Sequence, residues 1–295
     1  MKKLYTPSTV KTIKDSHDFK FSKSLGQNFL VDKNIVDNII EGAGLGPEDF
    51  VIEIGPGMGV ITREAALKAE KVVAVEIDKT LIPILEETLS DLDNVQVINQ
   101  DILKTDVNEI ISTCSGGKTS KNVKIIGNLP YYITTPIIMK ILEDDVPADS
   151  ITIMMQKEVA ERIDAVPGTK DYGALSVAVQ YYCDTRIITH VPKGAFIPQP
   201  KVESTVIRLD IRPHSKVELM DKDIFFQCVK AGFGQRRKTL SNSLMGVRGI
   251  TKDIVKEALE AAGIEPSRRA ETLDLYEFAN LANQVYMRLS KERGL

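Results

Sequence analysis

The sequence predicts an α/β fold in which a mainly parallel, Rossmann-like sheet with an antiparallel edge strand is followed by a smaller all-helical domain. Between residues 50 and 155, short β-branched runs alternate with segments of helical periodicity. This rhythm is typical of right-handed βαβ units, which place helices on both faces of a sheet. Beyond residue 213, every segment with a clear pattern is helical.

Five short apolar runs predict the parallel strands, because strands covered on both faces are apolar throughout. They are Phe50–Ile54, Val72–Val75, Val95–Ile98, Val123–Ile126 and Ile151–Met155. Helical spacing is found between them at Val60–Lys68, Leu81–Leu92 and Thr135–Leu142. In the last of these helices Pro136 falls in the first turn, where a missing N–H costs little. Two further runs, Arg186–Ile188 and Thr205–Leu209, have no long helix between them and predict an antiparallel pair at one edge.

The pattern breaks at residues 211–221, where Pro213, His214 and Ser215 interrupt any periodicity. Helices are expected after this break at Ile224–Phe233, Lys252–Ala262 and Leu273–Leu289, with Gly263 at a helix C-cap. We therefore expect a basic N-terminal extension over residues 1–20, the sheet domain over 21–212 and the helical domain over 213–295.

Composition excludes several classes of protein. The 295 residues suffice for one large core and a smaller module. No apolar run reaches the roughly 20 residues of a membrane span, and the basic, polar N-terminus lacks the apolar core of a signal peptide. Cys114, Cys183 and Cys228 have no paired spacing, which predicts reduced thiols in a cytoplasmic protein. Three scattered histidines predict no metal site, and we expect a monomer.

The net charge of −3 is unevenly distributed along the chain. Residues 1–24 carry +4 and residues 213–295 carry +3, so the stretch between them carries −10. Basic ends on an acidic centre fit a polyanionic partner that is approached by the ends. Solvated tails would give the same pattern.

An amide and an aromatic ring end the fourth expected strand, in Asn128-Leu129-Pro130-Tyr131. The proline removes a ladder donor and holds the preceding residue extended, so the strand stops here. Open α/β sheets bind ligands at such carboxyl ends. An Asn oxygen and a free carbonyl can accept both hydrogens of an exocyclic amine while the ring stacks on the attached base. For the tetrapeptide alone, a strand-ending turn with a packed Tyr is an equal alternative.

A glycine-rich loop follows the first expected strand, with Gly55, Gly57 and Gly59. Its G-x-G-x-G spacing differs from the G-x-G-x-x-G of dinucleotide folds. Glu76 ends the second strand, where a carboxylate can accept both ribose hydroxyls, and Asp101 follows the third, where it can accept from an adenine amine. Each acid alone is more simply a solvated loop residue. The set indicates an adenosine-bearing cofactor without phosphates, which fits S-adenosylmethionine.

With these residues assembled, the chain resembles the ribosomal RNA adenine N6-dimethyltransferases, and most closely their small-subunit branch. The motifs that carry the resemblance run in family order over nearly the whole chain. They are Leu25–Leu30, Glu53–Gly59, Glu76, Asp101, Gly127–Tyr132, Ala195–Ser204 and Phe233–Leu240. The resemblance implies a class I S-adenosylmethionine-dependent methyltransferase. It would dimethylate N6 of two adjacent adenines in the 3′-terminal hairpin of 16S ribosomal RNA and act in 30S subunit biogenesis.

The resemblance also implies a role for each matching residue. Asn28, Leu30, Gly55, Glu76, Asp101 and Asn128 would contact the cofactor. Asn128 and the carbonyl of Leu129, bent out of line by Pro130, would accept from the target amine, and Tyr131 and Phe196 would stack on the flipped adenine. The N-terminal extension has no counterpart with a role.

The basic segments of the helical domain fit an RNA partner, the 16S ribosomal RNA or a small-subunit precursor. Arg236, Arg237 and Lys238 stand beside a helix, and Arg268 and Arg269 add two cations, so all five could neutralise phosphates. A solvated helix face is the alternative.

Three other functions remain as rivals. An Erm-type methyltransferase of 23S ribosomal RNA shares the chemistry, although Leu129, Tyr132, Pro136 and the Arg236–Lys238 helix look like the small-subunit branch. A nicotinamide oxidoreductase is disfavoured by the glycine spacing. Intact Asn128, Tyr131 and Phe196 argue against a catalytically silent RNA-binding or transcription factor.

Overall fold

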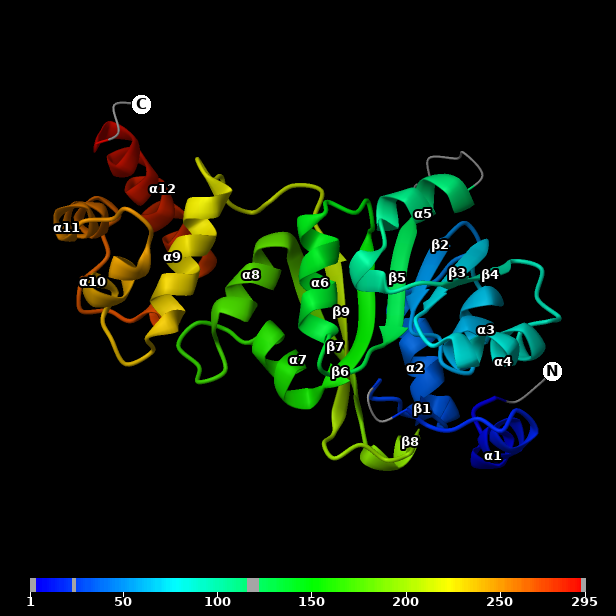
Figure 1. The fold of residues 1–295 in the computed structure, drawn as a ribbon. Coiled ribbons are helices and arrows are strands. Elements are labelled where there is room, and N and C mark those ends of the chain that lie inside the picture. Colours follow the sequence, from blue (N-terminus) through cyan, green and yellow to red (C-terminus); the bar gives the residue numbers. More distant parts are fainter. Residues whose placement is uncertain (1–3, 23–24, 116–121, 293–295) are drawn as a thin grey trace. The chain divides into compact units, whose positions relative to one another are not determined.

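The computed structural model describes residues 4–22, 25–115 and 122–292 (Figure 1). Residues 1–3 of the expected N-terminal extension and 293–295 of the expected helical domain lie outside this range. The chain divides into two compact units, one of residues 1–160 and 184–211 and the other of residues 161–183 and 212–295. The second unit thus includes a segment from the middle of the chain, which the expected single boundary at residue 213 did not anticipate.

The first unit is built on a seven-stranded sheet with the strand order β4-β3-β2-β5-β6-β9-β7. The strands are β2 (Phe50–Ile54), β3 (Lys71–Glu76), β4 (Val95–Asn99), β5 (Val123–Asn128), β6 (Ser150–Gln156), β7 (Cys183–Val191) and β9 (Ser204–Ile211). The pairs from β4 to β6 are parallel, whereas β9 runs antiparallel to β6. The mainly parallel sheet with an antiparallel strand toward one edge is therefore confirmed.

Helices cover both faces of this sheet. Those of the first unit are α1 (Pro7–Ser16), α2 (Lys33–Ala43), α3 (Val60–Ala66), α4 (Ile82–Thr88), α5 (Val107–Cys114) and α6 (Thr134–Glu143), with short 3-10 turns η1 (Lys79–Leu81), η2 (Ile102–Lys104) and η3 (Lys193–Ala195). One core cluster joins buried side chains of α1 to α4 with the sheet. Because crossovers are right-handed, α5 and α6, which lead back across the sheet, cover the opposite face.

A separate two-stranded sheet pairs β1 (Phe29–Leu30) with β8 (Phe196–Ile197) in antiparallel register. Leu30 stands opposite Phe196, and the Val31 N–H donates to the Ala195 carbonyl at 2.8 Å. This pairing brings together two motifs that are far apart in the sequence.

The second unit is helical. It contains α8 (Ala174–Tyr182), α9 (Lys222–Gly234), α10 (Leu240–Ser243), α11 (Lys252–Ala261) and α12 (Leu275–Glu292), with η4 (Leu244–Gly246) and η5 (Ala270–Thr272), and α7 (Lys157–Asp164) leads into it. Asp221 caps α9 and Thr251 caps α11, each accepting from a backbone N–H of its helix. Buried Phe225 and Phe278 belong to its core. The smaller helical part of the fold is thus confirmed.

Candidate active site

Three strand ends meet at one point on the carboxyl edge of the sheet. The last residue of β2 pairs with Val75 on one side and with Gly127 on the other. The residues that follow in these strands, Gly55, Glu76 and Asn128, therefore lie abreast. The connections also reverse direction here, since β2 has β3 on one side and β5 on the other. Open α/β sheets bind ligands at such a switch point.

A cavity opens at these strand ends and is mostly apolar. It is lined by the predicted residues Asn28, Leu30, Gly55, Glu76, Asp101, Asn128, Leu129, Pro130 and Tyr131. Among its lining residues, all within the described part of the chain, none is Lys, Arg or His. A cavity with two carboxylates and no basic side chain favours a cationic ligand and gives a pyrophosphate no counter-charge.

The glycine loop presents bare backbone to the cavity. Gly55 has φ 70° and Gly57 has φ 60°, a left-handed backbone conformation that residues other than glycine rarely adopt. A Cβ atom at Gly57 would lie 3.2 Å from the ring of Phe29, so the ring covers the loop closely. Phe29 in turn packs edge-on against Phe19 at a centroid distance of 5.8 Å. The N-terminal segment therefore forms one wall of the site.

Glu76 lies at the end of β3 and is only 5% exposed. Its Oε1 accepts from the Asp78 backbone N–H at 2.8 Å. Burial raises the pKa of this carboxyl to about 7, although backbone N–H groups near it act in the opposite direction. The charge of this carboxyl therefore changes with pH near neutrality.

Glu53, within the same motif, is fully buried. Among the described residues, no donor lies in hydrogen-bonding geometry to either of its carboxyl oxygens. Burial is the main cause that raises its pKa to about 8, with a smaller contribution from the neighbouring Glu76 and an opposing one from Thr62. At neutral pH this carboxyl is mostly protonated, so it adds little charge beside Glu76.

Asp101 begins the turn η2 and lines the adjacent part of the cavity wall. One carboxylate oxygen accepts from the Leu103 N–H at 3.0 Å, and the other lies 3.9 Å from Lys104 Nζ. The side chain is 29% exposed, so it retains acceptor capacity toward the cavity. The neighbouring Gln100, which we did not predict, adds an amide to the same wall; its position next to Asp101 was the available signal.

Asn128 is oriented by a backbone contact. Its Nδ2 donates to the Asn28 carbonyl at 3.0 Å, and no donor among the residues that the structure describes binds its Oδ1. Within the described residues, no donor binds the Leu129 carbonyl, whereas the Pro130 carbonyl accepts from Ile133 N and from the Thr134 hydroxyl. Two acceptors therefore remain at the end of β5.

The ring of Tyr131 lines the cavity and is fixed by its hydroxyl, which is 2.7 Å from Ser204 Oγ. Ser204 is fully buried at the start of β9. Its role was missed from the sequence, although it belongs to the motif that ends at that residue. The two motifs are thereby joined at the site.

Phe196 is not brought to the cavity wall. Its side chain is 1% exposed, belongs to the core cluster and stands opposite Leu30 in the small sheet. A base could stack on this ring only after the side chains covering it have moved.

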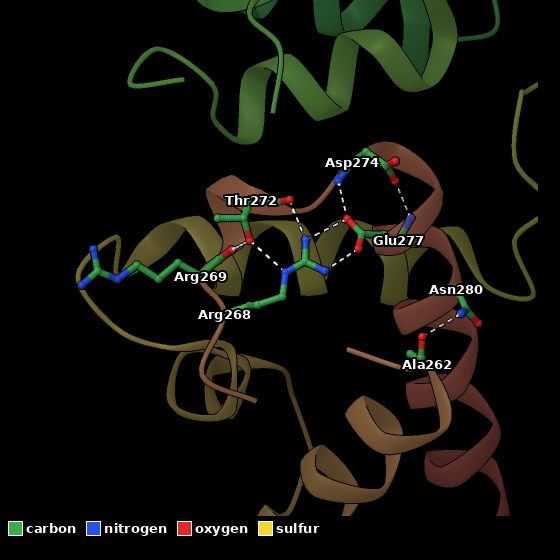
Figure 2. A network of polar contacts seen from close by, with 7 residues as sticks. All are labelled: Ala262, Arg268, Arg269, Thr272, Asp274, Glu277 and Asn280. Atoms are coloured by element: carbon green, nitrogen blue, oxygen red, sulfur yellow. Dashed lines mark hydrogen bonds and ion pairs between the residues drawn. The ribbon is translucent and has the colours of Figure 1, made fainter. Parts of the chain in front are cut away.

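The basic residues of the helical unit divide into two kinds. Arg268 is held by Glu277 and Thr272, donating to the Glu277 carboxylate and to both oxygens of Thr272 (Figure 2). Arg236 donates to the carbonyls of Lys170 and Tyr172 at 2.7 and 3.0 Å. These two guanidinium groups therefore connect neighbouring segments of the helical unit.

Arg236 is itself exposed, and so are the other three cations. Arg269 extends away from the network in Figure 2, and Arg237 and Lys238 are exposed as well. The Leu240 N–H donates to the Arg268 carbonyl at 2.8 Å, which places the two basic segments side by side. A composite basic surface of Arg237, Lys238 and Arg269 results.

The described residues contain no group of side chains suited to hold a metal ion, and none of their helices is long and apolar enough to cross a membrane.

The sheet order and the cavity at its switch point define a Rossmann-like methyltransferase. A model of the family described as ribosomal RNA adenine dimethylase matches residues 18–281. The chain belongs to this family, and it is an enzyme.

Known relatives agree with this assignment. The chain is 54% identical over 292 residues to "Ribosomal RNA small subunit methyltransferase A" of Clostridioides difficile (strain 630), covering 99% of this chain and 100% of the relative. It resembles the solved structure of a dimethyladenosine transferase from Plasmodium falciparum (TM-score 0.74, 25% identity, 90% and 98% of the two chains). It also resembles the 23S rRNA methyltransferase ErmE (TM-score 0.67, 28% identity, 88% and 100%).

Proposed function

We propose that this enzyme transfers methyl groups from S-adenosylmethionine to N6 of two adjacent adenines in the 3′-terminal hairpin of 16S ribosomal RNA, in the cytoplasm, during 30S subunit biogenesis. The observation that carries the proposal is the meeting of Gly55, Glu76 and Asn128 at one cavity that contains carboxylates and no cation. The family and the small-subunit relative support the choice of RNA.

The cavity residues fit the cofactor. The ribose hydroxyls would be accepted by Glu76 and the adenine amine by Asp101, while the bare backbone at Gly55 allows close approach. Asn28 and Leu30 would close the cavity from the N-terminal side. When bound, S-adenosylmethionine supplies a methyl group on a positively charged sulfur, which the two acids and the absence of a cation favour.

The residues at the end of β5 would activate the target amine. The N6 lone pair of adenine is delocalised into the ring, so it is a poor nucleophile. Accepting both N–H hydrogens with Asn128 Oδ1 and the Leu129 carbonyl favours a pyramidal nitrogen whose lone pair points at the methyl group. As the nitrogen–methyl bond formed and the sulfur–methyl bond broke, sulfur would become neutral and positive charge would develop on nitrogen, where the acceptor oxygens and the Tyr131 ring would stabilise it until one N–H proton is lost to solvent. Holding the amine and the methyl group in line contributes on the order of several kcal/mol more.

Phe196 is proposed as the second stacking face, conditional on a rearrangement that uncovers its ring. The pair of β1 and β8 is the element that would move, because it carries both Leu30 of the cavity wall and Phe196. RNA phosphates would bind Arg237, Lys238 and Arg269, whereas the guanidinium groups of Arg236 and Arg268 already donate to backbone and carboxylate oxygens of the helical unit.

The test is methyl transfer from labelled cofactor to small subunits that lack these methyl groups, followed by nucleoside analysis. We expect label in N6,N6-dimethyladenosine of 16S ribosomal RNA. The same assay is run in parallel on 23S ribosomal RNA, because the chain is 28% identical to the 23S rRNA methyltransferase ErmE. Label in 23S RNA and none in the small subunits would favour the Erm-type alternative. A protein that binds subunits without transferring label would instead be a silent RNA-binding factor.

A further inference from the structure

Tyr132 presents an aromatic ring to solvent beside the proposed active site. The residue is 60% exposed, although it directly follows Tyr131, whose ring lines the cavity. Among the residues that the structure describes, no other aromatic ring is paired with that of Tyr132. Single exposed apolar side chains are common on protein surfaces, and what distinguishes this ring is its place directly beside the residue that lines the cavity.

A fixed turn holds this ring in position. The Pro130 carbonyl accepts from the Ile133 N–H and the Thr134 hydroxyl, each at 3.1 Å, and these bonds close the turn that carries both tyrosines. A Cβ atom added at Gly26 would lie 3.6 Å from Cε1 of Tyr132, so the ring stands near that glycine with room for a methyl group between them. The turn fixes the backbone that carries the ring before any substrate arrives, which lowers the entropic cost of stacking on it.

Tyr131 lies in the cavity wall and Tyr132 at its rim, which is the arrangement that a flipped nucleotide and its neighbour in the RNA chain would need. Their Cα atoms are about 3.8 Å apart. The hydroxyl of Tyr131 is tied to Ser204 inside the wall, whereas Tyr132 stands outside the cavity lining at its rim, near Gly26. When one base enters the cavity beside Tyr131, the base attached through the next phosphodiester is left at the rim.

We propose that Tyr132 is the stacking site for the nucleotide next to the target adenine. This inference rests on the proposed function and adds a contact to the flanking base. Stacking on an aromatic ring tolerates any base, because every base has a π-face. For a substrate with two adjacent adenines, one adenine occupies the cavity while the other lies on Tyr132.

The test compares substitutions that keep or remove the aromatic face. Tyr132→Phe keeps the ring, and Tyr132→Leu keeps an apolar side chain near Gly26 without a π-system. The matched control is Tyr276→Ala, because Tyr276 is an equally exposed tyrosine (59%) on α12 of the other unit. Small subunits are reconstituted with 16S RNA whose 3′-terminal hairpin is synthetic and carries either both adenines or one adenine beside an abasic nucleotide.

On the intact hairpin, Tyr132→Leu should raise KM for the subunit by roughly 5- to 150-fold, the loss expected for one base–aromatic stack. Tyr132→Phe and Tyr276→Ala should match the wild type. On the abasic hairpin, Tyr132→Leu and wild type should have equal KM values, since the stacking partner is gone. Unchanged thermal unfolding and cofactor affinity check that the variant is folded, and Tyr132→Ala, measured in the same way, provides a second variant.

Equal KM values for wild type and both ring-deleting variants on the intact hairpin would overturn the inference. A defect that persists undiminished on the abasic hairpin would overturn it as well, because the ring would then contact something other than the flanking base. Failure of the wild type to methylate natural under-methylated subunits would be a different result, since it removes the proposed function and this inference with it.

Discussion

Replacing Asn128 by alanine removes one of the two acceptors at the end of β5. In the proposed reaction this acceptor is used most strongly as positive charge develops on the adenine nitrogen, so its loss should act on kcat. A single preorganised polar group of this kind contributes about 2.7–4 kcal/mol to the transition state, and Asn128→Ala should therefore lower kcat by about 10²–10³-fold.

A smaller effect on the cofactor is expected from the same change. The Asn128 Nδ2 donates to the Asn28 carbonyl at 3.0 Å, and Asn28 lines the cavity. Removing the donor leaves this carbonyl without that partner, which costs roughly 1–3 kcal/mol when the group is fully buried. Because Asn28 is only half-buried and water can reach it, the loss in cofactor affinity should stay at the lower end of this range.

The assay is single-turnover methyl transfer to under-methylated small subunits, with cofactor affinity measured separately by calorimetry. Asn108→Ala serves as the matched control, because Asn108 is an exposed asparagine of α5 away from the cavity lining. A folded Asn128→Ala enzyme that dimethylates adenine within a few-fold of the wild-type rate would refute the proposed role of the amide.

Three further predictions test the remaining parts of the site. The cofactor would bind the ionised form of Glu76, whose pKa is raised to about 7. Cofactor affinity should therefore fall up to tenfold per pH unit below pH 7 and level off above it. Calorimetry across about pH 5.5–8.5 should show that Glu76→Gln binds the cofactor more weakly than the wild type and without this pH dependence. Ser204→Ala and Tyr131→Phe should each raise KM for the subunit. The double variant should have the same KM as the single variants, because each substitution removes the same hydrogen bond. Additive increases in KM would show that this bond does not orient the ring. Arg237→Ala should reduce the slope of log affinity against log salt by about 1 with unchanged thermal unfolding, whereas Arg268→Ala should lower the unfolding temperature, and the reverse assignment would contradict the division of the basic residues.

The strands were predictable because each parallel strand is a short β-branched run that stops at a turn signal. The expected Phe50–Ile54 coincides with β2, and β5 ends at Asn128, directly before Leu129-Pro130. The helices α2 and α5 were not assigned, although Asp32 and Asp106 cap their first turns. Such caps are visible in the sequence, so these two omissions were avoidable.

Other features depend on tertiary position and could not be predicted. Nothing local to Phe196 shows that it pairs with Leu30 and is covered. Likewise, the sequence presents Arg268 and Arg269 as equivalent neighbours. The turn that brings Glu277 against Arg268 makes one of them a structural residue and leaves the other exposed.

The division of charge along the chain gives the two units opposite electrostatic tasks. The first unit, which supplies the whole cavity lining, carries −6, and the second unit carries +3, so the first unit as a whole would repel RNA phosphates. The negative charge suits a cofactor whose reactive sulfur is cationic, but it opposes the second substrate. In the proposed function, the exposed cations Arg237, Lys238 and Arg269 of the second unit would supply the attraction that the first unit lacks. Contacts that do not depend on charge, such as a base on Tyr131 or Tyr132, are the kind of RNA contact that an acidic surface can make, because stacking involves the neutral base and leaves the phosphates in solvent.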